Sequence, residues 1–306
     1  MPNGPFHRAL PGAVRLPRHE GAYIAQGPAL GMALDAVIDG VRYDGPVESV
    51  RGIVAPHIDL HRGWEAYGHA YGALHHARGD FDVYVILGTV HDGISAPFAL
   101  TTHAFRTPFG DLRTHTACID RLRRVCGDWV LDDAAAHGPE HSIEFQTLFL
   151  AHHAARRRRA LPTIVPVLCG VPLRNGRPST QATDFLAELR AIIGECGDRV
   201  CVIAAVDLAH MGPQFGDHAP LAVDDLVELQ RRDRQTLEHV RTLAPTAFWN
   251  DVVSGGNPRR ICGLTPLYAF LTLLRSTAIQ GHITAYDQAA DEGGSVVSYA
   301  SVIFTA

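Results

Sequence analysis

The pattern of apolar and polar positions predicts an alternation of strands and helices from about residue 50 onward. Short apolar runs rich in β-branched residues are typical of buried strands, and apolar residues that recur every three or four positions are typical of helices with one buried face. We expect strands at 50–55, 82–87, 163–168, 200–206, 281–286 and 295–304. We expect helices at 28–38, 64–77, 117–125, 183–196, 223–241, 246–253 and 262–274, and a further helix that begins near His141.

This order of elements predicts an α/β fold. Strand, helix and strand follow one another in a βαβ pattern, which aligns the strands in parallel and places helices on the faces of the sheet. No repeat, low-complexity tract or change of composition marks a boundary, so we expect a single domain with a central, largely parallel mixed sheet and helices on both faces. The Pro- and Gly-rich residues 1–49 are expected to form an amino-terminal wrapping arm, and residues 50–306 the α/β domain.

Composition narrows the class of protein. The chain has 306 residues, of which 46% are hydrophobic and 19% charged, enough to bury a large core. The formal net charge is -5, and the one cationic run, from Arg156 to Arg159, is short, so we expect no nucleic-acid partner. No apolar stretch approaches the ~20 residues of a membrane helix, and the amino terminus has no signal-peptide pattern. We therefore expect a cytoplasmic protein with no membrane partner, whose six cysteines, none of them in a CxxC pair, stay reduced.

Three core segments end at residues that bind soft or borderline metal ions. His57 follows the apolar run GIVAP, His91 follows VILGTV, and Cys262 lies at the expected start of a helix, where the helix dipole favours a thiolate. Taken singly, a histidine at a strand end is often structural and a cysteine is often an inert buried residue. Because the carboxyl ends of parallel strands meet at one edge of a sheet, the three together predict one metal site of two imidazoles and a thiolate. We expect Thr89 and Asp92 to fix the tautomer of the His91 ring.

Four further residues are candidates for acid/base or substrate-binding roles. Asp207 and His210 follow the buried run VIAAV, which predicts that they lie at the same edge of the sheet. His210 could move protons beside a metal while Asp207 orients its ring or binds substrate, or the two could simply close a loop. Asp59 and His61 come directly after His57, and either could bind or deprotonate a substrate.

Other motifs add support or exclude alternatives. In PEHSIEFQ, Glu140, His141 and Glu144 open a helix without the HExxH spacing of a zinc protease, so we expect them to support the site by hydrogen bonding rather than to catalyse. Arg106 and Asp111 of RTPFGDLR are expected to form a structural turn over the pocket mouth. The chain has no GxSxG, no GxxxxGK[ST], and no GxGxxG after a strand, which disfavours a hydrolase triad, an NTPase and a dinucleotide enzyme.

The segments APH, ILGTVHDG, FRTPFGDLR, EHSIEFQ, VPVLCG, VDLAHMGPQFG, ICGLTP and SVVSYAS occur in this order along the chain. Over about residues 51–306 the sequence resembles the Memo family, known in prokaryotes as AmmeMemoRadiSam system protein B. The resemblance implies metal ligands at His57, His91 and Cys262, with Asp207 and His210 beside them. It also implies a fold similar to that of the class III extradiol dioxygenases, with the cysteine in place of their carboxylate ligand.

One segment departs from the family pattern. After its first histidine the chain has HIDLHRG where the family usually has a glycine- and tyrosine-bearing loop, so Asp59 and His61 belong to this protein's own version of the pocket.

These observations lead to a functional hypothesis with two alternatives. The first is a mononuclear non-haem metalloenzyme, with Fe(II) as the expected ion and copper or zinc as alternatives, that carries out redox or oxygenase chemistry on a small organic or peptide-derived substrate. The alternatives are a metal- or peptide-binding protein without turnover and a zinc hydrolase. The resemblance also implies a radical SAM protein as a partner.

Overall fold

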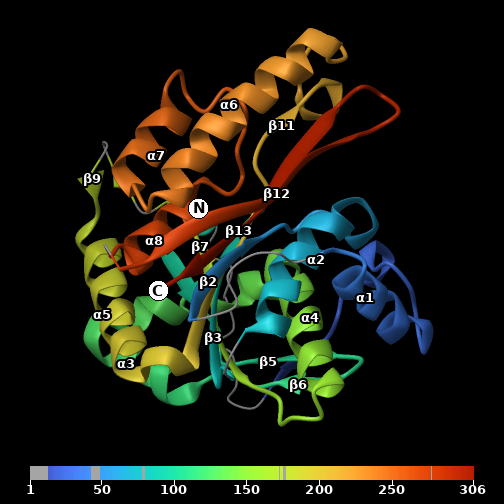
Figure 1. Ribbon diagram of the computed structural model, residues 1–306. Coiled ribbons are helices and arrows are strands. Elements are labelled where there is room, and N and C mark those ends of the chain that lie inside the picture. The colour runs from blue at the N-terminus through green and yellow to red at the C-terminus, as the bar shows by residue number, and fades with distance from the viewer. Residues whose placement is uncertain (1–12, 43–48, 78–79, 172, 175–176, 277) are drawn as a thin grey trace.

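The computed structural model describes residues 13–42, 49–77, 80–171, 173–174, 177–276 and 278–306. Within these residues, eight strands form a central mixed sheet in the order β11-β13-β2-β10-β3-β7-β4, and β12 also pairs with β13 (Figure 1). The strands are β2 (Val50–Ala55), β3 (Val83–Thr89), β4 (Phe98–Leu100), β7 (Thr163–Cys169), β10 (Val200–Ala205), β11 (His210–Met211), β12 (Gln280–Ala290) and β13 (Val296–Thr305).

The sheet is parallel at its centre and antiparallel on both flanks. β2, β10, β3 and β7 are parallel neighbours, whereas β13, β12 and β11 on one side and β4 on the other run antiparallel to the strands they pair with. Every residue of β3 and of β10 is buried, as expected for strands that are covered on both faces. The prediction of a single α/β domain with a mixed sheet and helices on both faces is confirmed, although the parallel pairing is limited to the four central strands.

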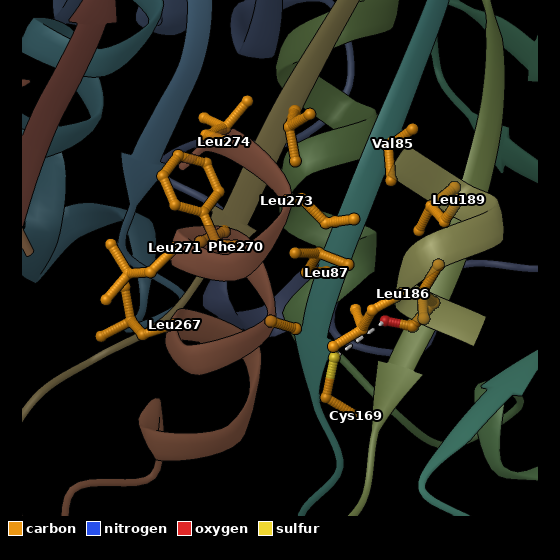
Figure 2. Packing of buried hydrophobic residues seen from close by; sticks show 14 of the residues in the cluster. Val85, Leu87, Cys169, Leu186, Leu189, Leu267, Phe270, Leu271, Leu273 and Leu274 are labelled. Atoms are coloured by element: carbon orange, nitrogen blue, oxygen red, sulfur yellow. Dashed lines mark hydrogen bonds between the residues drawn. The ribbon is translucent and has the colours of Figure 1, made fainter. Parts of the chain in front are cut away.

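Helices cover the two faces of the sheet as two separate cores. On one face lie α1 (Ala29–Asp39), α2 (Leu60–His76) and α4 (Ser142–Arg156). On the other lie α3 (Thr116–Cys126), α5 (Thr180–Cys196) and α8 (Leu264–Leu274), joined by α6 (Val223–Arg241) and α7 (Pro245–Val253). Figure 2 shows part of the second core, where Leu273 of α8 points toward β3, the strand that carries Val85 and Leu87. Such packing fixes the carboxyl ends of the central strands in place.

Smaller elements surround the main sheet. β1 (Val14–Arg15), β5 (Ala104–Thr107) and β6 (Gly110–Leu112) form a separate three-stranded sheet, and β8 (Leu173–Arg174) pairs with β9 (Arg177–Pro178). Short 3-10 helices occupy Glu20–Ala22, Asp128–Leu131, Ala134–His137, Gly197–Arg199 and Pro213–Phe215. No helix in the described ranges is long and apolar enough to cross a membrane.

The observed elements differ from the predicted ones mainly at their ends. α2 begins at Leu60 rather than at 64, and α8 begins at Leu264 with Gly263 as its N-cap, so Cys262 lies just before the helix rather than in it. The strands β4, β5 and β6 lie in a Pro- and Gly-containing region for which the sequence pattern predicted neither a strand nor a helix. Part of the predicted arm, residues 1–12 and 43–48, lies outside the described residues, and the boundary at residue 50 stays a prediction. The described part of that arm pairs with β5 through β1, and α1 packs on α2.

Candidate metal centre

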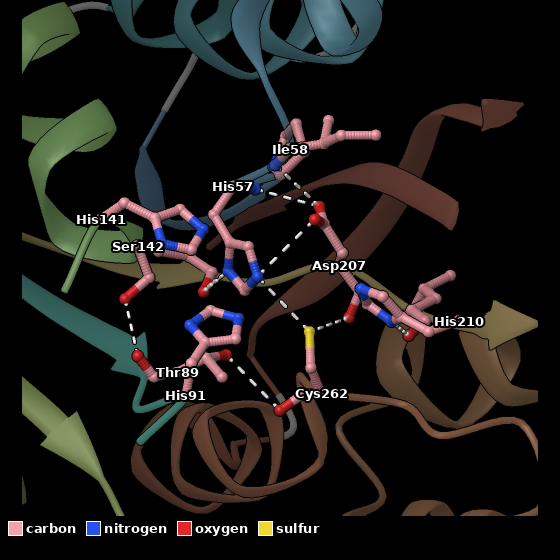
Figure 3. Close-up of polar contacts among 12 residues, drawn as sticks. His57, Ile58, Thr89, His91, His141, Ser142, Asp207, His210 and Cys262 are labelled. Atoms are coloured by element: carbon pink, nitrogen blue, oxygen red, sulfur yellow. Dashed lines mark hydrogen bonds and ion pairs between the residues drawn. The ribbon is translucent and has the colours of Figure 1, made fainter. Parts of the chain in front are cut away.

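Three neighbouring parallel strands bring polar residues to one edge of the sheet. In the order β2, β10, β3, each strand is followed, two residues past its last residue, by a titratable side chain: His57, Asp207 and His91. Since parallel strands end at the same edge, the three side chains come together there. The predicted convergence of His57 and His91 is confirmed (Figure 3).

Two glycines allow the Cys262 loop and α4 to approach the strand ends closely. A Cβ placed on Gly263 would lie 2.7 Å from the Asp207 carbonyl oxygen and 2.7 Å from the Val206 Cβ, so any larger residue would push the loop away from the end of β10. A Cβ on Gly88 would lie 2.7 Å from Ser142 Oγ, and glycine there lets α4 approach β3. The loop and the helix therefore close on the strand ends from two sides.

The three predicted ligands fit a single ion. The ligand atoms of His57, His91 and Cys262 lie within 4.8 Å of one another. The Cys262 Sγ is 3.4 Å from His57 Nε2. Two ligands of one tetrahedral ion, a sulfur at about 2.3 Å and a nitrogen at about 2.0 Å, stand roughly 3.5 Å apart. The donor atoms thus have the spacing that a shared metal requires.

Hydrogen bonds set the His57 ring for metal binding. Its Nδ1 donates to the Ala205 carbonyl at 2.9 Å, since a carbonyl only accepts, and this leaves the Nε2 lone pair facing the Cys262 sulfur. Burial, and then the charge of His91, lowers the pKa of His57 to about 3, so the ring is neutral at physiological pH. The neutral tautomer with a free Nε2 is the form that binds a metal ion.

Glu140 fixes the tautomer of the His91 ring, as the Ala205 carbonyl fixes that of the His57 ring. The His91 Nδ1 donates to the Glu140 carboxylate at 3.0 Å, and the same carboxylate accepts the backbone N–H groups of His91, His141 and Ser142 at 2.8 to 2.9 Å. Burial alone would raise the pKa of Glu140, but the bond and charge of His91 and the backbone N–H groups hold it well below its usual range. This carboxylate and imidazole pair is a common support for metal ligands. The expectation that Thr89 and Asp92 fix the ring is therefore wrong: the Thr89 hydroxyl instead contacts the Cys262 carbonyl at 3.4 Å.

Asp207 holds the chain that carries His57. Its Oδ1 accepts the backbone N–H groups of His57 at 3.0 Å and Ile58 at 3.3 Å, and its Oδ2 is 3.6 Å from His57 Nε2. Its backbone carbonyl is 3.7 Å from the Cys262 Sγ, and burial, followed by the Asp207 charge, raises the pKa of that thiol in the metal-free protein. A bound cation would reverse this effect, because it favours the thiolate.

His210 stands beside these groups with a free ring nitrogen. Its Nδ1 donates to the Leu208 carbonyl at 3.2 Å, which leaves Nε2 unprotonated in the neutral ring. Burial lowers the pKa of His210, while the nearby Asp207 charge opposes the shift. Within the part of the chain that the structure describes, the ring of His210 makes no hydrogen bond to Asp207. The Leu208 carbonyl, rather than Asp207 as predicted, therefore orients the His210 ring.

His141 extends the cluster toward the solvent. Its ring stacks on His91 with centroids 4.6 Å apart and an interplanar angle of 18°, and lies 5.3 Å from His57. On its other side the ring of His19, from the amino-terminal segment, is 5.2 Å away. His91, Glu140 and His141 also lie close enough to hold an ion, but the Glu140 oxygens already accept three backbone N–H groups and the His91 ring. Glu140 is therefore better placed to support His91 than to bind a second metal.

The structure places the other predicted residues at the periphery. The Asp59 carboxylate pairs with Arg62 at 2.8 Å, and His61 is exposed in the first turn of α2. No contact between either side chain and the metal-ligand group is recorded for the described residues, so their role with the substrate stays a prediction. Arg106 and Asp111 form a two-bond pair across the β5 and β6 hairpin.

Glu144 anchors a segment that the sequence analysis did not connect with the site. Its carboxylate, only 1% exposed, pairs with Arg15 at 2.6 Å and accepts the N–H and the ring Nδ1 of His19 and the hydroxyl of Tyr23. Arg15 also donates to the backbone carbonyl of Glu140 at 2.7 Å. The one available signal was an isolated arginine and histidine in a proline-rich region, which has no periodicity to indicate its partner.

Fold and site together define an α/β protein with a candidate metal centre of two histidines and one cysteine at the carboxyl edge of its parallel strands. The family model for Memo-like proteins matches residues 15–303. The chain belongs to the Memo family, and the match begins well before the region that carries the resemblance in sequence.

Individual relatives agree with this assignment. A MEMO1 family protein of Methanopyrus kandleri is 30% identical, with 85% of each chain covered. One of Aquifex aeolicus is 29% identical over 83% of this chain and 63% of its own length. One of Archaeoglobus fulgidus is 23% identical over 95% of this chain and 99% of its own.

Proposed function

We propose that this protein is a mononuclear non-haem metalloenzyme that uses His57, His91 and Cys262 to hold Fe(II) for redox or oxygenase chemistry on a small organic or peptide-derived substrate. The observation that carries the proposal is the convergence of two imidazoles and one thiol with their donor atoms within 4.8 Å, on three segments of one sheet edge. If held by these three residues, Fe(II) would supply one-electron chemistry with O2 and a substrate.

The chain's own residues prepare this site. Ala205 and Glu140 each hold a proton on Nδ1 of a ligand imidazole and so keep Nε2 free to bind. The His91 side chain is 38% exposed, whereas that of His57 is 2% exposed, so the site opens to solvent on the His91 side. A substrate would enter from there.

His210 is the residue we assign to proton transfer. Its Nε2 is free in the neutral ring, because Nδ1 is used by the Leu208 carbonyl. Asp207 keeps the backbone of His57 and Ile58 in place. From the family resemblance we also propose a radical SAM protein as a partner, and from the sequence pattern we propose the cytoplasm as the location.

Anaerobic purification followed by metal analysis and exposure to O2 tests the proposal. We expect about one iron per chain and an O2-dependent change in the absorption spectrum. Cys262→Ala should lose the metal while staying folded, and Cys201→Ala, which removes a fully buried thiol from β10, is the matched control that should keep it. His210→Ala should keep the metal and lose the response to O2.

Other outcomes would favour the alternatives. Colourless protein with stoichiometric zinc would replace redox chemistry with hydrolysis. Iron that is bound but unchanged by O2 in wild type and His210→Ala alike would indicate metal binding without turnover. Full metal content in Cys262→Ala would refute the proposed ligand set.

A further inference from the structure

A buried ion pair away from the ligands joins two segments of the site. Asp233 of α6 is fully buried and Arg259 is 6% exposed, and the arginine donates from Nη1 to Asp233 Oδ1. Apolar residues of similar volume often stabilise a core as well as a buried ion pair does. The position of this pair in the hydrogen-bond network indicates a role other than stability.

Asp233 reaches the segment that carries Asp207 and His210 through one hydroxyl group. Its Oδ2 accepts from Ser298 Oγ at 2.6 Å and from the Tyr286 hydroxyl at 3.1 Å. Because the Ser298 hydroxyl gives its proton to Asp233, its lone pairs are free to accept the Ala209 N–H at 2.9 Å. The backbone of Ser298 bonds to Ala209 and Leu208 as well, at 3.0 and 2.7 Å.

Arg259 reaches the cysteine segment directly. It lies three residues before Cys262, and its carbonyl accepts the His210 N–H at 2.8 Å. The next residue, Arg260, donates to the His210 carbonyl at 3.1 Å. Arg259 Nη2 is fixed by Thr236 Oγ1 at 2.7 Å. One carboxylate oxygen of Asp233 is thus linked through Ser298 to the Asp207 to His210 segment. The other is linked through Arg259 to the segment that carries Cys262.

We propose that Asp233 is a positioning residue that sets the Cys262 sulfur relative to the Asp207 to His210 segment, and so the affinity of the site for its metal. This inference rests on the proposed metal centre. It adds a residue of α6 that lies in none of the motifs that carry the family resemblance.

Co2+ titration of the metal-free protein tests the inference without any activity assay. Bound Co2+ has an absorption band that arises from thiolate coordination, so the titration reports both affinity and the Cys262 bond. Asp233→Asn keeps the shape of the side chain and removes the charge, and Ser298→Ala removes the hydroxyl group that joins Asp233 to the Ala209 N–H. We expect each to weaken Co2+ binding about tenfold, in the range found for residues that support metal ligands, and to change the thiolate band.

Ser301→Ala is the matched control. Ser301 is a second fully buried serine of the same strand, but its hydroxyl accepts from Thr284 at 2.9 Å rather than from the site. Its Co2+ affinity and spectrum should equal those of the wild type. In the double variant Asp233→Leu with Arg259→Met, the melting temperature should be close to that of the wild type, because the apolar pair fills the same space. Its Co2+ affinity should stay low, because the hydrogen bonds to the two segments are missing.

The outcomes separate this inference from the proposed function. Wild-type Co2+ affinity and band in folded Asp233→Asn and Ser298→Ala would overturn the positioning role and leave the metal centre intact. An equal loss in Ser301→Ala, or recovery of affinity together with stability in the apolar pair, would overturn it too. If Asp233→Asn does not fold, Ser298→Ala decides. A wild type that binds no Co2+ at this thiolate would refute the metal centre and the positioning role together.

Discussion

Replacing Glu140 with glutamine removes the charge that receives the ring proton of His91. In the wild type, one oxygen accepts the His91 N–H at 2.9 Å and the ring Nδ1 at 3.0 Å, and the other accepts the N–H groups of His141 and Ser142. Glutamine has only one accepting oxygen. If that oxygen faces His141 and Ser142, the amide NH2 faces two N–H groups of His91.

Two effects then set the size of the loss. A hydrogen bond to a charged group contributes about 1.5 to 3 kcal/mol, and the ring can regain a partner only by moving its proton from Nδ1 to Nε2. That move occupies the lone pair that would bind the metal. We expect Glu140→Gln to weaken metal binding about 10- to 100-fold, or roughly 1.4 to 2.8 kcal/mol.

Competition with a chromophoric chelator measures the affinity, and long-range nitrogen NMR of the imidazoles reports which nitrogen of His91 carries the proton. Glu188→Gln, which removes a carboxylate that pairs with Arg121 away from the site, is the control and should bind metal like the wild type. Wild-type affinity in Glu140→Gln, or weaker binding with the His91 proton still on Nδ1, would refute the tautomer argument.

Three further predictions concern stability. Burial would raise the pKa of Glu144, but the Arg15 charge and several N–H donors lower it below its ordinary 4.5. The stabilisation is therefore present above pH ~4.5 and is lost as pH falls through the lower folded pKa. In urea unfolding, the difference in free energy of unfolding between wild type and Glu144→Gln should shrink below pH ~4.5. A constant difference from about pH 7 to about pH 3 would contradict this. Leu189→Ala, at a fully buried site of α5, should lower the free energy of unfolding by about 2 to 5 kcal/mol, and a loss under 1 kcal/mol would mean that the core can collapse around the gap. Gly88→Ala should destabilise the protein by about 1 to 3 kcal/mol through contacts of the new methyl group with α4. Gly194→Ala, in α5 with open space around it, should stabilise the protein by up to about 1 kcal/mol. Equal effects of the two changes in thermal unfolding would refute the close approach of α4 to β3.

The convergence of the site could be predicted from the sequence because it follows from topology. His57 and His91 each follow an apolar run that reads as a strand, and parallel strands end at one edge, so proximity needs no knowledge of packing. Cys262 is harder to place, since it lies in a loop before α8 and not in the helix itself.

The partners of these residues could not be predicted, because they depend on how helices pack on the sheet. Glu140 supports His91 from the start of α4, 49 residues along the chain, whereas Thr89 and Asp92 are close only in sequence. Asp233 lies on a helix with charged residues on about half of its positions, and nothing in the pattern marks Asp233 as the buried one. The segment around Arg15 and His19 has no periodicity, although it contributes to the surroundings of the site.

The antiparallel flank has a consequence for the order in which the protein matures. β2, the strand that leads to His57, has β13 as one of its two neighbours, and β13 is the last strand of the described fold. The sulfur of Cys262 comes from a point 205 residues after that histidine. A chain still emerging from the ribosome therefore lacks both a fixed His57 and the thiol. A metal ion held by the proposed ligands would then be loaded only after synthesis has passed both, and its uptake would report completion of the fold.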